Sequence, residues 1–70
     1  MLFRSVNVEL GEGVRATDIR LFNTFGQLVS ITNVKSHITN IDVSQLPNGI
    51  YFIQVFNADK LITTGKLVRN

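Results

Sequence analysis

The chain has no cysteine and no tryptophan, and it has one proline and one histidine among its 70 residues. Without cysteine no disulfide can form, and a chain of this length buries only about 60% of its unfolded surface. No apolar stretch approaches the ~20 residues of a membrane-spanning helix, and charges interrupt the early apolar residues that a signal peptide needs. We therefore expect one small domain that folds on a small core, with no membrane span and no signal peptide in these residues.

Neither sign of charge dominates the chain. It has seven Lys and Arg and five Asp and Glu, which gives a formal net charge of +2. The cations are spread along the chain and never form a run. A nucleic-acid surface needs clustered cations, so we expect no nucleic-acid partner.

The chain is organised around residues 41–56, which read IDVSQLPNGIYFIQVF. Alternation at Ile41 to Val43 predicts a half-buried strand, and Pro47 with Asn48 and Gly49 predicts a turn in which Asn48 or Gly49 takes a positive φ. Residues 50–56 are β-branched or aromatic apart from Gln54, so we expect this strand at the centre of the core, covered on both faces.

Five other segments have strand patterns, at residues 5–10, 14–22, 27–32, 37–41 and 61–68. In the second of them Asp18 and Arg20 share the outward face, where a weak ion pair is expected. Gly65 in the last segment suggests a bulge or the close approach of another backbone. No segment has helical spacing, so the sequence predicts six or seven short antiparallel strands in a β-sandwich or a small barrel.

Two turns carry specific expectations. In the turn at residues 23–26, Gly26 is the natural positive-φ position, and the Asn23 side chain can bond to backbone two residues on. Tyr51, just after the turn at residues 46–49, is placed like the tyrosine corner of immunoglobulin-like sandwiches, whose hydroxyl bonds back to the preceding loop. The alternative is a core aromatic with a solvated hydroxyl.

The side chains that carry chemistry are few. His37, Asp42 and Ser44 are near in sequence, but strand residues an odd number apart point to opposite faces, so we expect no triad and a solvated His37. No DxDxDG loop, histidine pair or CxxC occurs, so no catalytic, cofactor or metal residue is predicted. The aromatics could stack on sugars if they faced outward, but their strand spacing favours the core, except for Phe25 at a turn tip.

Three motifs in order resemble a known family. They are Asn23-x-x-Gly26-Gln27-Leu28-Val29, then Ile41-Asp42-Val43-Ser44-x-Leu46-Pro47-x-Gly49-x-Tyr51, and then Gly65-Lys66-Leu67-Val68. With these motifs, residues 17–70 resemble the type A C-terminal sorting domain of the type IX (Por) secretion system of Bacteroidota. The resemblance implies an immunoglobulin-like antiparallel β-sandwich without enzymatic activity or cofactor, and a single sorting domain over residues 1–70.

The resemblance also implies partners and a route. A cargo attached at the N-terminal side would pass through the periplasm, cross the outer membrane by the type IX translocon, and lose this domain to a sortase-like peptidase. The cargo would then be secreted or held at the cell surface. The resemblance places translocon recognition in the last strand, at Gly65, Lys66, Leu67, Val68 and Arg69. It also implies that six other residues chiefly stabilise the fold: Asn23, Gly26, Leu46, Pro47, Gly49 and Tyr51.

The chain departs from the family at its start, because members usually open with a Pro-Asn-Pro type segment and this chain opens MLFRS. We therefore expect residues 1–5 to be foreign and the family's N-terminal segment and cargo to be missing, and packing of Leu2 and Phe3 in the core would contradict this. Two other functions stay open. A carbohydrate-binding or adhesive module predicts outward aromatics on one sheet face, and a small enzyme predicts a cleft around His37. The sorting interpretation predicts a domain without a ligand pocket.

Overall fold

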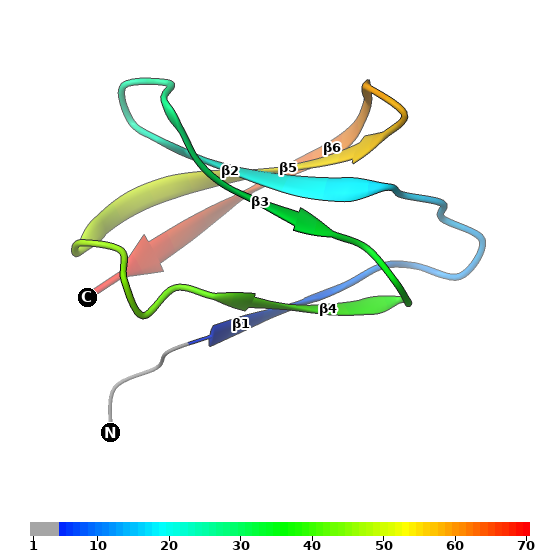
Figure 1. Cartoon of the computed structure of the whole chain (residues 1–70), viewed down its shortest axis with the longest axis horizontal. Helices are drawn as coiled ribbons and strands as arrows, with labels where there is room; N and C mark the ends of the chain where they lie inside the picture. The colour runs from blue at the N-terminus through cyan, green and yellow to red at the C-terminus, as the bar shows by residue number, and fades with distance from the viewer. Residues whose placement is uncertain (1–4) are drawn as a thin grey trace.

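The computed structural model describes residues 5–70, which form six β-strands and no helix. The strands are β1 (Ser5–Glu9), β2 (Asp18–Asn23), β3 (Leu28–Asn33), β4 (Ile38–Asp42), β5 (Gly49–Asn57) and β6 (Lys60–Arg69). All pairings are antiparallel, in a four-stranded sheet of order β3-β2-β5-β6 and a two-stranded sheet β1-β4. Figure 1 shows the small sheet lying against one face of the large one. The all-β, immunoglobulin-like sandwich is confirmed. The expectation for Leu2 and Phe3 falls outside the described residues.

The four-stranded sheet has an inner and an outer face that follow the alternation of its sequence. Ile19 and Leu21 of β2 point inward and are each only 1% exposed. Asp18 and Arg20 lie on the outer face, where the Arg20 Nε donates to the Asp18 Oδ2 at 2.7 Å. The predicted pairing across one face of this strand is therefore confirmed.

Strand β2 begins later than its sequence pattern predicts. Residues 14–17 continue the period-two pattern, but the strand starts at Asp18 and Val14 is 41% exposed. The Val14 N–H instead bonds to the Gly11 carbonyl at 3.1 Å, which closes a turn. These residues carry the chain from the small sheet to the large one, and alternation alone does not distinguish a crossing segment from a strand.

The small sheet supplies the other half of the core. Val6 pairs with Ile41 and Val8 pairs with Thr39, and these four side chains are half-buried or buried. The core cluster built from both sheets and their loops consists of Leu10, Ile19, Leu21, Ile41, Val43, Tyr51 and Val55. Thr39 is the one buried polar residue described, and its hydroxyl has no hydrogen-bond partner among residues 5–70.

The outer face of β5 is not covered, which corrects the expectation for the central strand. Tyr51 and Val55 are buried on the inner face, but Ile50 and Phe52 on the outer face are each 42% exposed. The second sheet has only two strands and packs on one face, so no layer formed by residues 5–70 lies over the outer face of the large sheet.

The aromatic side chains likewise differ from expectation. Phe22 pairs with Phe52 on the outer face, and Phe56 lies on the same face under Arg20, whose guanidinium carbon is 3.9 Å from the ring centroid. Tyr51 alone among the described aromatics belongs to the core, so the prediction that most of them are core residues is wrong. Phe25 at its turn tip is 87% exposed, as predicted.

Candidate functional site

The last strand forms one edge of the four-stranded sheet. Strand β6 pairs with β5 alone, in register from Gly49 opposite Arg69 to Asn57 opposite Lys60. Figure 1 shows β6 running beside β5 to the C-terminus with no strand on its other side. Among the described residues, no strand other than β5 pairs with β6, so β6 is an edge strand.

The five recognition residues predicted in β6 divide between two environments. Gly65, Lys66 and Val68 are exposed, with Val68 at 52%. Leu67 and Arg69 are half-buried, and Leu67 packs against the core cluster. A partner that approaches the domain from outside therefore meets the backbone of Gly65 and the side chains of Lys66 and Val68 directly.

Arg69 is tied to the turn at residues 46–49. Its Nε donates to the Leu46 carbonyl oxygen at 2.8 Å, across 23 residues of sequence. The Tyr51 hydroxyl donates to the Pro47 carbonyl oxygen of the same turn at 2.6 Å. Of the two alternatives that the sequence left open, this is the tyrosine corner and not the solvated hydroxyl. Gly49 follows with φ 154°. Two hydrogen bonds therefore hold this turn, one from Tyr51 at the start of β5 and one from Arg69 at the end of β6.

The turn at residues 23–26 lies at the same end of the sheet. The Asn23 Oδ1 accepts hydrogen bonds from the N–H groups of Phe25 at 2.9 Å and Gln27 at 3.0 Å, and Gly26 has φ 80°. Asn23 stands opposite Tyr51, which stands opposite Leu67 on β6. This row across three strands brings together the two turns predicted to maintain the fold and the strand predicted to be recognised.

Gly65 has neither of the two roles expected from its sequence position. The irregularity of the β5–β6 ladder lies between Val55 and Phe56, and Gly65 pairs regularly with Ile53. A Cβ at Gly65 would meet nothing within 4 Å, so no other backbone approaches it. The prediction of a bulge or a close approach at Gly65 is wrong, and the bulge falls at Ile62 instead.

A family model described as the secretion system C-terminal sorting domain matches residues 4–70. The chain belongs to this family. The match adds residues 4–16 to the stretch that resembled the family, and it identifies a C-terminal sorting signal of the type IX system. No curated protein and no solved structure matches the chain.

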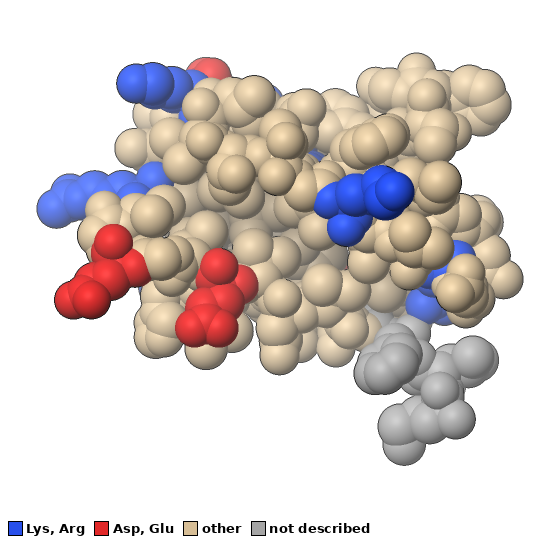
Figure 2. Space-filling model, turned by 180° about the vertical axis from the view of Figure 1, so that it is seen from behind, with Lys and Arg blue, Asp and Glu red and all other residues tan. Residues whose placement is uncertain are grey.

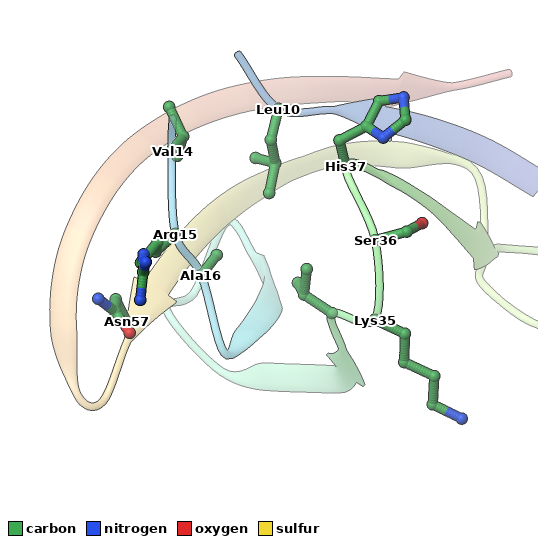
Figure 3. A pocket seen from close by; sticks show the side chains of 9 residues that line it. Leu10, Val14, Arg15, Ala16, Lys35, Ser36, His37 and Asn57 are labelled. Carbon is green, nitrogen blue, oxygen red and sulfur yellow. The ribbon is translucent and has the colours of Figure 1, made fainter. Parts of the chain in front are cut away.

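The sorting domain has an open hollow of about 460 Å³ at the end where the loops before β2 and β4 meet. The hollow is lined by Leu10, Val14, Arg15, Ala16, Val34, Lys35, Ser36, His37 and Asn57. Figure 3 shows Leu10 directed into it and the Lys35 chain extended away from it. This hollow departs from the expectation of a domain without a pocket, but it is open, and His37 is one of nine residues that line it.

The neighbours of His37 do not form a nucleophilic site. His37 itself is exposed, as predicted. It precedes β4 and Asp42 ends it, so the strand separates the two residues by about 16 Å. The Asp42 Oδ1 accepts the Ser44 N–H at 2.8 Å, and the Ser36 hydroxyl donates to the Ile38 carbonyl at 2.9 Å. The hydroxyl beside His37 is therefore engaged with backbone, and Asp42 lies at the far end of the strand.

An ionic cluster on the outer face fixes the hairpin between β5 and β6. Arg20 donates to Asp18 through Nε at 2.7 Å and to Asp59 through Nη2 at 2.9 Å. The hydrogen bond from the Thr17 hydroxyl, followed by that from Arg20, lowers the pKa of Asp18 below its usual value. The two carboxylates in turn raise the pKa of Arg20. The cluster joins one guanidinium to two carboxylates and links β2 to the hairpin between β5 and β6.

The rest of the sorting domain's charge is dispersed. On the face drawn in Figure 2, blue and red side chains are interspersed around a broad uncharged area. Within residues 5–70, no three His, Asp or Glu side chains gather as metal ligands. The described part of the chain also contains no helix long and apolar enough to cross a membrane.

Proposed function

We propose that this chain directs a cargo, attached at its N-terminal side, across the outer membrane through the type IX translocon, and that β6 is the element the translocon recognises. The observation that supports this proposal is the position of β6 at a sheet edge, with Gly65, Lys66 and Val68 exposed on it. An edge strand offers unpaired backbone groups and two rows of side chains to a partner.

The proposal includes the finer features that the resemblance implies. Cargo and domain pass through the periplasm of a member of the Bacteroidota as a type A substrate. A sortase-like peptidase then removes the domain, and the cargo is secreted or attached at the cell surface. The domain works as one unit over residues 1–70, without a cofactor, and its contribution is recognition.

The five residues of the recognition segment have different roles in this proposal. Lys66 and Val68 contact the translocon, because both side chains are exposed on the outer face. Leu67 and Arg69 hold β6 in place through the core and through the Leu46 carbonyl. Truncation from Lys66 onward would therefore remove fold and recognition together and would not separate them.

Point variants in a secretion assay can separate loss of translocon recognition from loss of the fold. A fluorescent protein behind a periplasmic signal is fused to residues 1–70 and expressed in a bacterium with an active type IX system. The double variant Lys66→Ser/Val68→Ser should accumulate in the periplasm. The matched control Lys60→Ser/Leu61→Ser likewise removes one lysine and one aliphatic residue, from the other end of β6 where both are exposed, and should be exported. Thermal unfolding of each purified fusion verifies that the domain is folded.

Two results would contradict the proposal in different ways. Retention of the unaltered, folded fusion would show that the chain is not a sufficient export signal. Equal export of the double variant and the control would show that Lys66 and Val68 are not recognised.

A carbohydrate-binding or adhesive module is the second candidate function. The outward pair of Phe22 and Phe52, with Phe56 on the same face, is the observation that favours it, since aromatic faces stack on sugar rings. Binding of the purified chain to surface polysaccharide, abolished by Phe52→Ala, would support this candidate. The sorting proposal predicts no such binding.

A further inference from the structure

The edge of β6 is the longest regular free edge in the described molecule. Residues Thr63 to Arg69 pair with Val55 to Gly49 without interruption, and the bulge at Ile62 ends the regular stretch. On the opposite edge, β3 is interrupted between Leu28 and Ser30, which leaves four paired residues. Strands β1 and β4 pair over five residues. A seven-residue edge spans about 20 Å, the length of an ordinary strand.

The backbone along this edge can accept another strand. In an antiparallel ladder, every second residue of β6 directs its N–H and C=O away from β5, so three or four residues of the segment present both groups. No proline interrupts residues 63–69.

The charge of β6 specifies what kind of strand fits. The strand reads KLITTGKLVR, with three cations and no acidic residue. Lys66 is exposed on the outer face opposite Phe52 and forms no salt bridge with any residue from 5 to 70. A neighbouring strand with a carboxylate beside Lys66 would gain a cross-strand ion pair, whereas a basic strand would be repelled.

Pairing with a second copy of the chain is disfavoured by the same residue. Lys66 is the middle residue of the segment from Thr63 to Arg69, so full antiparallel pairing of two copies would place the two Lys66 side chains directly opposite each other. Like charges directly opposite are destabilising, and a lysine on an edge strand is a known protection against self-pairing.

We propose that β6 binds its partner by strand addition, with an extended acidic segment of the translocon pairing along Thr63 to Arg69 and placing a carboxylate beside Lys66. This inference rests on the proposed function and specifies how that recognition is made. The backbone supplies affinity, and Lys66 supplies selectivity against basic strands and against a second copy.

A pair of proline variants tests the backbone part in the secretion assay. Thr64 and Gly65 are both exposed, and their N–H groups point to opposite sides of β6. One of Thr64→Pro and Gly65→Pro therefore breaks the ladder to β5 and lowers the midpoint of urea unfolding. The other removes only an N–H at the free edge and keeps a midpoint near that of the unaltered chain. We expect this second, folded variant to be exported at least tenfold less.

A charge reversal tests the acidic partner and does not depend on proline. Lys66→Glu should reduce export about tenfold and leave the unfolding midpoint unchanged. Lys60→Glu makes the same change on the same strand outside the seven-residue segment and should be exported normally. Lys66→Arg retains the charge and should also be exported normally.

Each part of the inference can fail separately. Normal export of the folded proline variant would overturn strand addition, and normal export of Lys66→Glu would overturn the acidic partner. Dimers of the purified fusion in analytical ultracentrifugation that become monomers in the proline variant would show that the edge pairs with its own copy, and would overturn the translocon as occupant. Retention of the unaltered fusion would instead overturn the proposed function.

Discussion

The Tyr51 hydroxyl donates a 2.6 Å hydrogen bond to the carbonyl oxygen of Pro47, four residues earlier. The bond closes the turn at residues 46–49 over the first residues of β5, and Tyr51 itself is only 5% exposed. Tyr51→Phe keeps the ring and removes the donor, and it should lower the free energy of unfolding by about 1 kcal/mol. Urea unfolding of the two proteins, with an unchanged m-value, measures this difference. Equal midpoints would mean that the hydroxyl contributes nothing to the turn.

Arg69 should matter for stability, although the resemblance places it in the recognition segment. Arg69→Gln removes the hydrogen bond from Nε to the Leu46 carbonyl and should cost about 1 kcal/mol of stability. Lys66→Gln, an equal change of charge three residues earlier at an exposed position, should leave stability within about 0.5 kcal/mol of the unaltered chain. Thermal unfolding of both variants makes the comparison. A larger loss for Lys66→Gln would contradict the division of roles within β6.

Thr39 offers a stabilising substitution. Its hydroxyl is buried in the small sheet and has no partner among the described residues. Thr39→Val replaces the hydroxyl by a methyl group of similar size, which relieves an unpaired polar group and keeps a β-branched side chain. We expect the free energy of unfolding to rise by about 1 kcal/mol in urea titrations. A less stable variant would show that the hydroxyl is engaged in solution.

The hairpin between β5 and β6 carries backbone strain that substitution can relieve. Its two turn residues, Ala58 and Asp59, have φ 49° and 70°, values that favour glycine and asparagine over alanine. Ala58→Asn should stabilise the domain by about 0.5–1 kcal/mol, because asparagine adopts the left-handed region at lower cost. A raised melting temperature checks this, and Ala58→Val, which is β-branched, should lower it.

Acid should weaken the outer-face cluster through Asp18. Hydrogen bonds from Thr17 and Arg20 lower the pKa of Asp18 in the folded chain below its usual value of 3.8. The stabilisation is therefore fully present above the unfolded pKa and is lost as the pH falls through the folded pKa. Asp18→Asn should be less stable than the unaltered chain above pH 3.8, with a gap that narrows as the pH falls below it. A gap that is constant with pH in urea titrations would contradict this origin.

Much of this fold could be predicted because the period-two pattern reports directly which side chains face a core. Asp18 and Arg20 were predicted to face outward, and Ile19 and Leu21, which alternate with them, are buried. The backbone requirements of Asn23 and Gly26 are local to their turn. The pattern failed where the outcome depended on distant chain. Val14 fits the period-two pattern of a strand but lies in the segment that crosses between the sheets. Phe52 belongs to a strand whose composition is typical of a core, but its side chain faces solvent.

The residues of β6 show the same limit for the candidate site. The motif Gly65 to Val68 was visible in the sequence through its resemblance, but its division into exposed and anchoring residues was not. Arg69 bonds to Leu46 across 23 positions, and no local pattern predicts which carbonyl a long side chain reaches. The hollow beside His37 is likewise formed by loops that are distant in sequence.

By itself, the amino-acid sequence determined that the chain is all-β, where its turns fall, which strand faces are apolar, and which family it resembles. The first three depend on local backbone preferences and on side-chain periodicity, which neighbouring residues specify, and the family resemblance depends on three short motifs. The tertiary structure alone decided that β6 is an edge, that the outer face of β5 has no covering layer, and that Arg69 holds the turn at Leu46. Strand order and layer coverage depend on which distant segments pair, and pairing energies are shared between strands rather than contained in any one of them.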